Sequence, residues 1–253
     1  MSGLKDKVVI VTGAARGLGQ AYAERLAAEG AKIVAADILD CSETVDAVKA
    51  AGGEATGVIL DAGSTESADN MAAEAVKAYG RIDGLVNNAA LYAGLSGGPF
   101  ETLPEEEWQQ VMNVNITGLW RCSKAVLPAM KETGGGSIVN IASLAAVYGT
   151  PYSLHYATSK AAVIGMSRSM ARELGRYWIR VNSVGPSAVM TEATTSFFGD
   201  KIEKAKKVIA GGQSLQRNLE TEDLTGTIVY LLGDDSEFVT GQTIMVDGGT
   251  VFL

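Results

Sequence analysis

Residues 8–19 have the sequence Val-Val-Ile-Val-Thr-Gly-Ala-Ala-Arg-Gly-Leu-Gly, and this segment sets the architecture of the chain. Val8–Thr12 is an apolar, β-branched run that predicts a buried strand, and Leu18–Glu29 has the 3.6-residue apolar period of a helix. The glycines between them allow a tight turn and a close approach of the backbone to an anion at the helix N-terminus. The segment therefore predicts a βα unit that binds the pyrophosphate of a dinucleotide.

The same alternation of apolar β-branched runs and amphipathic segments continues along the chain. Further strands are expected at Ile33–Asp37, Glu54–Asp61, Gly84–Asn87, Ser137–Ala142, Ile179–Val184 and Thr243–Asp247. Further helices are expected at Thr65–Tyr79, Glu105–Lys131, Tyr152–Gly175 and Thr221–Leu232. Because apolar strands separated by helices belong to a parallel sheet covered on both faces, we expect an α/β chain: a single-domain Rossmann fold over residues 1–253 with a seven-stranded, doubly wound parallel sheet.

Composition excludes several classes of protein. The 253 residues are 47% hydrophobic and 20% charged, which suits one large domain, and the net charge of −8 argues against nucleic acid as a partner. No run reaches the length of a membrane span and the first residues lack a signal-peptide core, so we expect a cytoplasmic protein with no membrane partner. Cys41 and Cys122 lack metal-ligand spacing, and no acidic or histidine cluster predicts a metal.

Asp37, at the end of the second expected strand, indicates which dinucleotide is bound. A carboxylate there accepts hydrogen bonds from an adenosine ribose and repels a 2′-phosphate, which favours NAD over NADP. Arg16 beside the glycines argues the other way, because its guanidinium could pair with that phosphate, cover the adenine or stay in solvent. We weigh Asp37 more heavily and expect NAD (NADH), with NADP as the lesser alternative.

Tyr156 and Lys160 form the candidate chemical pair. Four positions apart on an expected helix, they lie on one face, and a fixed positive charge near a phenol favours the phenolate. We therefore expect Lys160 to lower the pKa of Tyr156 and make it an acid and base near neutral pH, although this spacing is also common on solvated helix faces. His155 lies about 100° around the helix from Tyr156, so we expect it to face packing or an interface.

The glycine turn, Asn87-Asn88-Ala89-Ala90, Ser143 and Tyr156–Lys160 together resemble the short-chain dehydrogenase/reductase family over essentially the whole chain. The resemblance implies a catalytic set of Asn115, Ser143, Tyr156 and Lys160. It implies cofactor contacts from Gly13, Arg16, Gly17, Leu18, Gly19, Asp37, Asp61, Ala62, Asn88, Ala89, Ala90, Tyr156, Lys160, Pro186, Ser187, Val189 and Thr191. Substrate contacts are expected from Ser143, Tyr156, Tyr92, Met190 and Phe197.

The resemblance also gives each catalytic position a role. Ser143 follows the fifth strand and would stabilise the oxyanion, and Lys160 would also hold the nicotinamide ribose. In the family the residue matching Asn115 interrupts its helix and holds a water that links the lysine to solvent. Asn113, two residues earlier, is not the matching residue, and Asn87 is expected to be structural. Two departures occur: Ala90 stands where the family usually has glycine, and Gly185-Pro186-Ser187 replaces its usual proline-glycine pair.

Two apolar segments, Leu91–Phe100 and a substrate loop at about residues 188–215, are expected to close over the nicotinamide. Their apolar and aromatic residues favour a hydrophobic, bulky or aromatic secondary alcohol or ketone as the small-molecule substrate. Residues 186–195 also resemble the corresponding loop of bacterial 1-phenylethanol dehydrogenases. The residues expected to line this wall are Leu91, Tyr92, Leu95, Phe100, Val189, Met190, Phe197 and Phe198.

Two other functions remain open. The first is a 3-oxoacyl carrier-protein reductase using NADPH, which the nearly neutral rim at residues 131–136 and the carboxylate of Asp37 disfavour. The second is a non-catalytic, NAD-sensing module, which the complete catalytic set disfavours. The family resemblance also implies a homotetramer or homodimer built through the helices expected at Glu105–Lys131 and Tyr152–Gly175.

Overall fold

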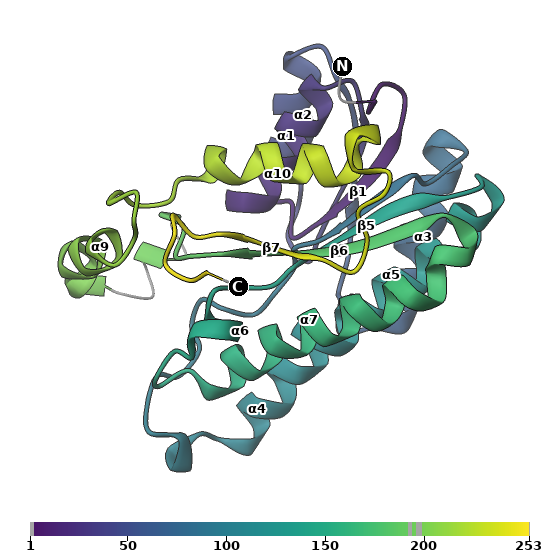
Figure 1. The fold of residues 1–253 in the computed structure, drawn as a ribbon. Coiled ribbons are helices and arrows are strands. Elements are labelled where there is room, and N and C mark those ends of the chain that lie inside the picture. The colour runs from purple at the N-terminus through teal and green to yellow at the C-terminus, as the bar shows by residue number, and fades with distance from the viewer. Residues whose placement is uncertain (1–2, 192–193, 196–198, 253) are drawn as a thin grey trace.

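The computed structural model describes residues 3–191, 194–195 and 199–252, and within them seven strands form one parallel sheet (Figure 1). The strand order is β3-β2-β1-β4-β5-β6-β7. The strands are β1 (Val8–Thr12), β2 (Lys32–Asp37), β3 (Glu54–Ile59), β4 (Gly84–Asn87), β5 (Gly136–Ile141), β6 (Ile179–Pro186) and β7 (Thr243–Val246). The predicted single-domain Rossmann fold is therefore confirmed, with strand ends that differ from the expected ones by at most two residues.

Helices cover both faces of the sheet, as the alternation of side chains along β1 requires. Val9 and Val11 pack into one apolar cluster with α1, α2 and α10, whereas Val8 and Ile10 pack into a second cluster with α3, α5 and α7. Figure 1 shows these two layers on opposite sides of the strands. The helices are α1 (Gly17–Ala28), α2 (Ser42–Ala50), α3 (Thr65–Tyr79), α4 (Glu105–Met112), α5 (Leu119–Glu132), α6 (Ala145–Tyr148), α7 (Leu154–Leu174), α9 (Ile202–Gly211) and α10 (Thr221–Leu232).

The chain reverses its direction of winding between β1 and β4. Strand β1 pairs with β2 on one side and with β4 on the other, so the loops that leave β1 and β4 diverge at their carboxyl ends. In an open parallel sheet this divergence is where ligands bind. The residues expected to hold the cofactor and to carry the chemistry follow these strand ends.

The expected helix at 105–131 is two helices joined by a π-helical turn, Asn113–Gly118. The amphipathic pattern did not reveal the turn, because its buried residues are Asn115 and Gly118, which give no apolar signal. Helix α7 begins at Leu154 and not at Tyr152, since Tyr152 has φ of 63° and lies outside helical geometry. Helices α2, α6 and α9 were not predicted, and no residue of α9 is buried.

Three other features bear on the composition-based expectations. Cys41 and Cys122 are buried free thiols. In the part of the chain that the structure describes, no helix is long and apolar enough to cross a membrane. Within the same ranges, no group of three or more His, Cys, Asp or Glu side chains is placed to hold a metal ion.

The short 3-10 turns lie at Phe100–Thr102, Gly175–Tyr177, Gly199–Lys201 and Asp234–Ser236.

Candidate active site

The glycine turn after β1 has the geometry that an anion-binding turn needs. Gly13 and Gly17 have φ of 67° and 60°, which L side chains rarely adopt. A Cβ on Gly19 would lie 2.0 Å from the carbonyl oxygen of Gly13, so glycine there lets α1 start close against the turn. A Cβ on Gly17 would meet no atom within 4 Å, so this part of the turn faces open space at the N-terminus of α1.

Acidic residues follow the strands on the β2 side of this turn. Asp37 accepts hydrogen bonds from the backbone amides of Ala15 (3.0 Å) and Leu39 (3.0 Å), and each carboxylate oxygen keeps a second lone pair for a ribose hydroxyl. Asp61 is exposed at the end of β3 and accepts from the Gly63 amide at 2.8 Å, while Ala62 beside it is buried. Arg16 is exposed at the start of α1.

Asn88 ties the glycine turn to the end of β4. Its side-chain amide donates to the carbonyls of Thr12 (3.0 Å) and Gly13 (3.2 Å), and the Asn88 and Ala89 backbone amides both donate to the Thr12 hydroxyl at 3.0 Å. Ala90 follows on the surface. Asn87 is buried and bonded to Ser123 and Asn140, so it has the structural place that was expected.

The segment after β6 contains a buried hydroxyl group without a hydrogen-bond partner in the described part of the chain. Ser187 is 7% exposed, and among the described residues its hydroxyl has no hydrogen-bond partner. Its backbone amide donates to Val246 at 3.1 Å, which fixes the chain after Pro186 beside β7. Val189 is buried and pairs with Leu219, and Thr191 contacts Thr194. The open glycine turn, the Asp37 lone pairs and this orphaned hydroxyl fit a dinucleotide laid along the strand ends.

Tyr156, Ser143 and Lys160 lie together at the carboxyl end of β5. The hydroxyl groups of Tyr156 and Ser143 are hydrogen-bonded, and the Lys160 ammonium lies 5.8 Å from the centre of the Tyr156 ring. Lys160 is 4% exposed and donates to the carbonyl of Ile141 at 2.7 Å, whereas Tyr156 is only partly buried. The helical spacing therefore placed the phenol and the amine on one face, as predicted.

The electrostatics of this pair differ from the expectation. Burial raises the pKa of the Tyr156 phenol, the hydrogen bond from Ser143 opposes that rise, and Tyr92 adds to it. Burial lowers the pKa of Lys160 to about 8. The prediction that Lys160 gives Tyr156 a lowered pKa was wrong for the chain's own groups, because loss of hydration disfavours the charged form of each partner.

Asn115 lies in the π-helical turn, and both polar atoms of its side chain are hydrogen-bonded. It is 2% exposed, accepts from the Leu91 amide at 2.7 Å, and donates to the Leu91 carbonyl at 3.1 Å and the Ser159 hydroxyl at 3.2 Å. Ser159 precedes Lys160, so Asn115 joins the end of β4 to the helix that carries the chemical pair. Asn113, two residues earlier, is exposed and accepts from Arg121.

Of the expected substrate wall, Tyr92 lies against the chemical pair. Its ring centre is 5.1 Å from that of Tyr156, and its hydroxyl is hydrogen-bonded to Thr194. Met190 is partly buried, and its amide donates to Leu219 at 3.0 Å. Phe100 is 72% exposed and does not pack. Phe197 and Phe198 lie outside the described residues.

Sequence reasoning missed several residues that organise this region. Thr12 is buried under the glycine turn, Ser159 and Thr194 hold Asn115 and Tyr92, and Glu107 bonds the histidine next to Tyr156. Thr12 stood in the glycine turn, Ser159 between Tyr156 and Lys160, and Thr194 in the segment 186–195, but none of these side chains was given a role, and Glu107 stood in no motif. Their partners here are remote in sequence, so no local pattern marked what they do. His155 is buried, as expected for a packing residue.

Known proteins are similar to this chain over nearly its whole length. A family model described as enoyl-(acyl carrier protein) reductase matches residues 13–251. The chain is 40% identical over 255 residues to a 3-alpha-(or 20-beta)-hydroxysteroid dehydrogenase of Mycobacterium bovis (99% of this chain, 92% of that protein). It is 37% identical over 253 residues to a 3-oxoacyl-(acyl-carrier-protein) reductase of Thermotoga maritima (98% and 99%). A carveol dehydrogenase from Mycobacterium avium, solved in complex with NAD, superposes with a TM-score of 0.92 at 30% identity, covering 99% of each chain.

Proposed function

Because this chain belongs to the short-chain dehydrogenase/reductase family of oxidoreductases, we propose that it transfers a hydride between NAD(H) and a hydrophobic, bulky or aromatic secondary alcohol or ketone. The observation that carries this proposal is the cluster of Tyr156, Ser143 and Lys160 at the end of β5, with the ring of Tyr92 against Tyr156. It combines a proton donor, an oxyanion partner and an apolar aromatic wall in one place.

The cofactor would lie along the strand ends, held by the residues expected from the family resemblance. The glycine turn would bind the pyrophosphate, Asp37 the adenosine ribose, and Asn88–Ala90 and Lys160 the nicotinamide half. Bound NAD would supply the hydride acceptor and, in its oxidised form, a positive charge that favours the phenolate of Tyr156. The carboxylate of Asp37 supports NAD over NADP because it would repel a 2′-phosphate.

The proton chemistry belongs to Tyr156. With its pKa raised, the phenol is neutral near pH 7 and can donate a proton to the oxygen of a ketone. Ser143 would donate a hydrogen bond to the same oxygen and stabilise its developing negative charge. Alcohol oxidation is the reverse: Tyr156 as phenolate takes the hydroxyl proton, and Lys160 with Asn115 supports the path by which that proton reaches solvent.

The substrate class rests on the apolar surface beside Tyr156. Tyr92 offers aromatic surface against Tyr156, and of the other residues expected in this wall Met190 is partly buried and Val189 is buried. Such a wall favours a hydrocarbon substituent on the carbinol carbon over a sugar or polyol. The hydroxysteroid and carveol dehydrogenases named above are relatives whose named substrates support the same class.

Reduction of an acyl-carrier thioester with NADPH is the second candidate, because the Thermotoga maritima relative is named for such an activity. Against it stand Asp37 in the adenosine region and the rim of residues 131–136, where Lys131 and Glu132 balance each other in charge. Greater activity on acyl thioesters with NADPH than on aryl ketones with NADH would establish this candidate in place of the first.

A panel of secondary alcohols and ketones, assayed with NAD(H) and NADP(H) in parallel, tests the proposal. We expect the highest kcat/KM for aryl or bulky ketones with NADH. Replacing Tyr156 with Phe should lower kcat by about a thousandfold and leave the Kd for NADH within about twofold, because only the proton donor is lost. Tyr152→Phe, at an exposed tyrosine nearby, is the control and should retain full activity. Substantial turnover in Tyr156→Phe would show that another group is the acid.

A further inference from the structure

The segment of residues 91–100, which we call the 91–100 loop, passes beside Tyr156 and is held at three places. Asn115 binds both backbone groups of Leu91, and Tyr92 lies against the Tyr156 ring. The third place is Ser96, at the middle of the loop. The first two belong to the site described above, but the third involves residues to which neither the family resemblance nor the chemistry assigns a role.

At this third place Glu107 accepts hydrogen bonds from both polar groups of Ser96. The Ser96 amide donates to Oε1 at 2.8 Å, and the Ser96 hydroxyl donates to Oε2 at 2.7 Å. The Ser96 hydroxyl, together with its amide and His155, holds the pKa of Glu107 below its usual range. Near neutral pH Glu107 is therefore a carboxylate, which makes these bonds charge-assisted and stronger than neutral ones.

His155 contacts the same carboxylate. The imidazole is 1% exposed, and its Nε2 lies 2.7 Å from the same oxygen of Glu107 that accepts from the Ser96 amide. Because a carboxylate can only accept, Nε2 carries the proton of this contact. Nδ1 is buried without a partner among the described residues, and the neutral tautomer leaves it as an acceptor, so no N–H group is buried unpaired there.

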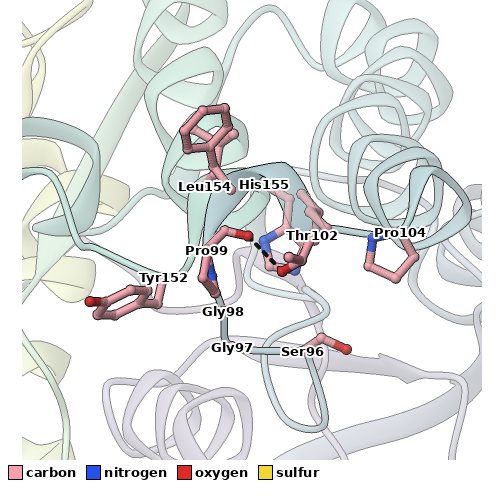
Figure 2. A pocket seen from close by; sticks show the side chains of 11 residues that line it. Ser96, Gly97, Gly98, Pro99, Thr102, Pro104, Tyr152, Leu154 and His155 are labelled. Carbon is pink, nitrogen blue, oxygen red and sulfur yellow. Dashed lines mark hydrogen bonds between the residues drawn. The ribbon is translucent and has the colours of Figure 1, made fainter.

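The 91–100 loop and the residues that follow it, up to Pro104, lie beside His155. Residues of the segment 96–104 line a pocket of about 30 Å³ together with Tyr152 and the first residues of α7, Leu154 and His155 (Figure 2). Figure 2 shows His155 beside Thr102, whose hydroxyl donates to the Pro99 carbonyl at 2.8 Å. The Gly98 amide also donates to the Tyr152 carbonyl at 3.3 Å, so the loop is bonded to the residues just before α7.

We propose that Ser96, Glu107 and His155 form a clamp of positioning residues that holds the 91–100 loop, and with it the Tyr92 ring, at a fixed distance from Tyr156. The clamp joins the loop, α4 and α7 at a point one residue before Tyr156 and four residues after Tyr92. It therefore sets the width of the substrate pocket on the Tyr92 side and determines which bulky substituents fit. This inference rests on the proposed function for its kinetic consequence, but not for the clamp itself.

Amide hydrogen exchange tests the clamp without any substrate. We expect Glu107→Ala and His155→Phe to raise the exchange rate of the Ser96 amide by about tenfold, because each removes the acceptor or the group that orients it. Glu106→Ala is the matched control: it removes a neighbouring, exposed carboxylate from the same first turn of α4 and should leave the rate unchanged. Unchanged exchange in Glu107→Ala would overturn the clamp.

Steady-state kinetics test its role in the site. In Glu107→Ala we expect KM for the preferred bulky ketone to rise about tenfold while kcat falls less than about threefold, and the Kd for NADH to stay within about twofold. His155→Gln, which restores an N–H donor, should recover most of the loss seen in His155→Phe. Should either variant fold poorly, Ser96→Ala removes only the exposed hydroxyl contact and should shift KM in the same direction by a smaller factor.

The two proposals fail in different ways. Faster Ser96 exchange with unchanged KM and kcat would overturn the positioning role while leaving the enzyme assignment intact. A wild-type protein without dehydrogenase activity would contradict the proposed function, whereas loss of Ser96 protection in Glu107→Ala would still support the clamp. No recovery in His155→Gln would overturn the part assigned to the Nε2 proton.

Discussion

Lys160 is a buried amine whose pKa is lowered to about 8 from an ordinary value of 10.5, and this shift makes stability depend on pH. Between these two values the unfolded chain binds a proton that the folded chain has released. The free energy of unfolding therefore rises with pH across this window, whereas below about pH 8 the folded protein carries the full cost of the buried ammonium.

Replacing Lys160 with Met should remove this dependence. We expect the wild-type protein to gain stability relative to Lys160→Met as the pH rises from 8 to 10.5, because the variant has no amine to discharge. Urea unfolding of both proteins at several pH values in this window measures the difference. If the stability of the wild-type protein relative to the variant does not rise with pH in this window, the pKa of Lys160 is not lowered in the folded protein.

The same residues show where sequence reasoning reaches its limit. Spacing alone placed Tyr156 and Lys160 on one helix face, because helical geometry follows from position in the chain. The direction of the Tyr156 pKa shift depends on how much water the fold removes from the phenol and on its neighbours Ser143 and Tyr92, which are remote in sequence. Sequence therefore predicted the partners and not their protonation.

At the scale of the element, the π-helical turn at Asn113–Gly118 gives two neighbouring asparagines different roles. Asn115, itself 2% exposed, makes three hydrogen bonds that join Leu91 to Ser159, whereas Asn113 makes its contact with Arg121 at the surface. Truncation of Asn115 leaves the partly buried backbone groups of Leu91 and the buried hydroxyl of Ser159 without this partner. Truncation of Asn113 exposes its partner to water, which can replace the lost bond.

Asn115→Ala should therefore destabilise the protein by about 2–3 kcal/mol, and Asn113→Ala by less than about 0.5 kcal/mol. Urea unfolding of the two variants against the wild-type protein gives both values under one condition. Equal losses would indicate that the Asn115 bonds are replaced by other groups, and that the turn does not depend on this side chain.

Elements with strong apolar patterns were predicted well, and those without were not. The seven strands are apolar runs whose burial follows from their composition, so their number and parallel arrangement could be inferred. Helix α9 buries no residue and therefore has no apolar stripe that would identify it, and α2 is short, with Val45 and Val48 among its few buried residues. The π-helical turn buries only Asn115 and Gly118, which give no apolar signal, so periodicity could not locate it.

At the scale of the whole molecule, helices α4, α5 and α7 lie along one side of the sheet and offer a surface for self-association (Figure 1). Trp120 on α5 and Leu154 on α7 are 48% and 44% exposed, and α7 presents the small residues Ala161 and Gly165 to solvent. Small residues allow two helices to approach closely, and exposed aromatic and aliphatic side chains mark association surfaces. We therefore retain the proposal of a homodimer or homotetramer built through these helices.

Ala161→Arg tests this assembly against Ala78→Arg, a matched change on α3 at an alanine that is also exposed. If α7 packs against its copy in a second chain, the arginine at position 161 places a bulky, charged group in a close helix contact. A tetramer should then dissociate to dimers, and a dimer to monomers. The arginine at position 78 should leave the mass unchanged. Light scattering coupled to size exclusion would report the wild-type protein and Ala78→Arg at two or four times the mass of one chain, and Ala161→Arg at half that value. A monomeric wild-type protein would eliminate the assembly, and an intact Ala161→Arg oligomer would move its interface away from α7.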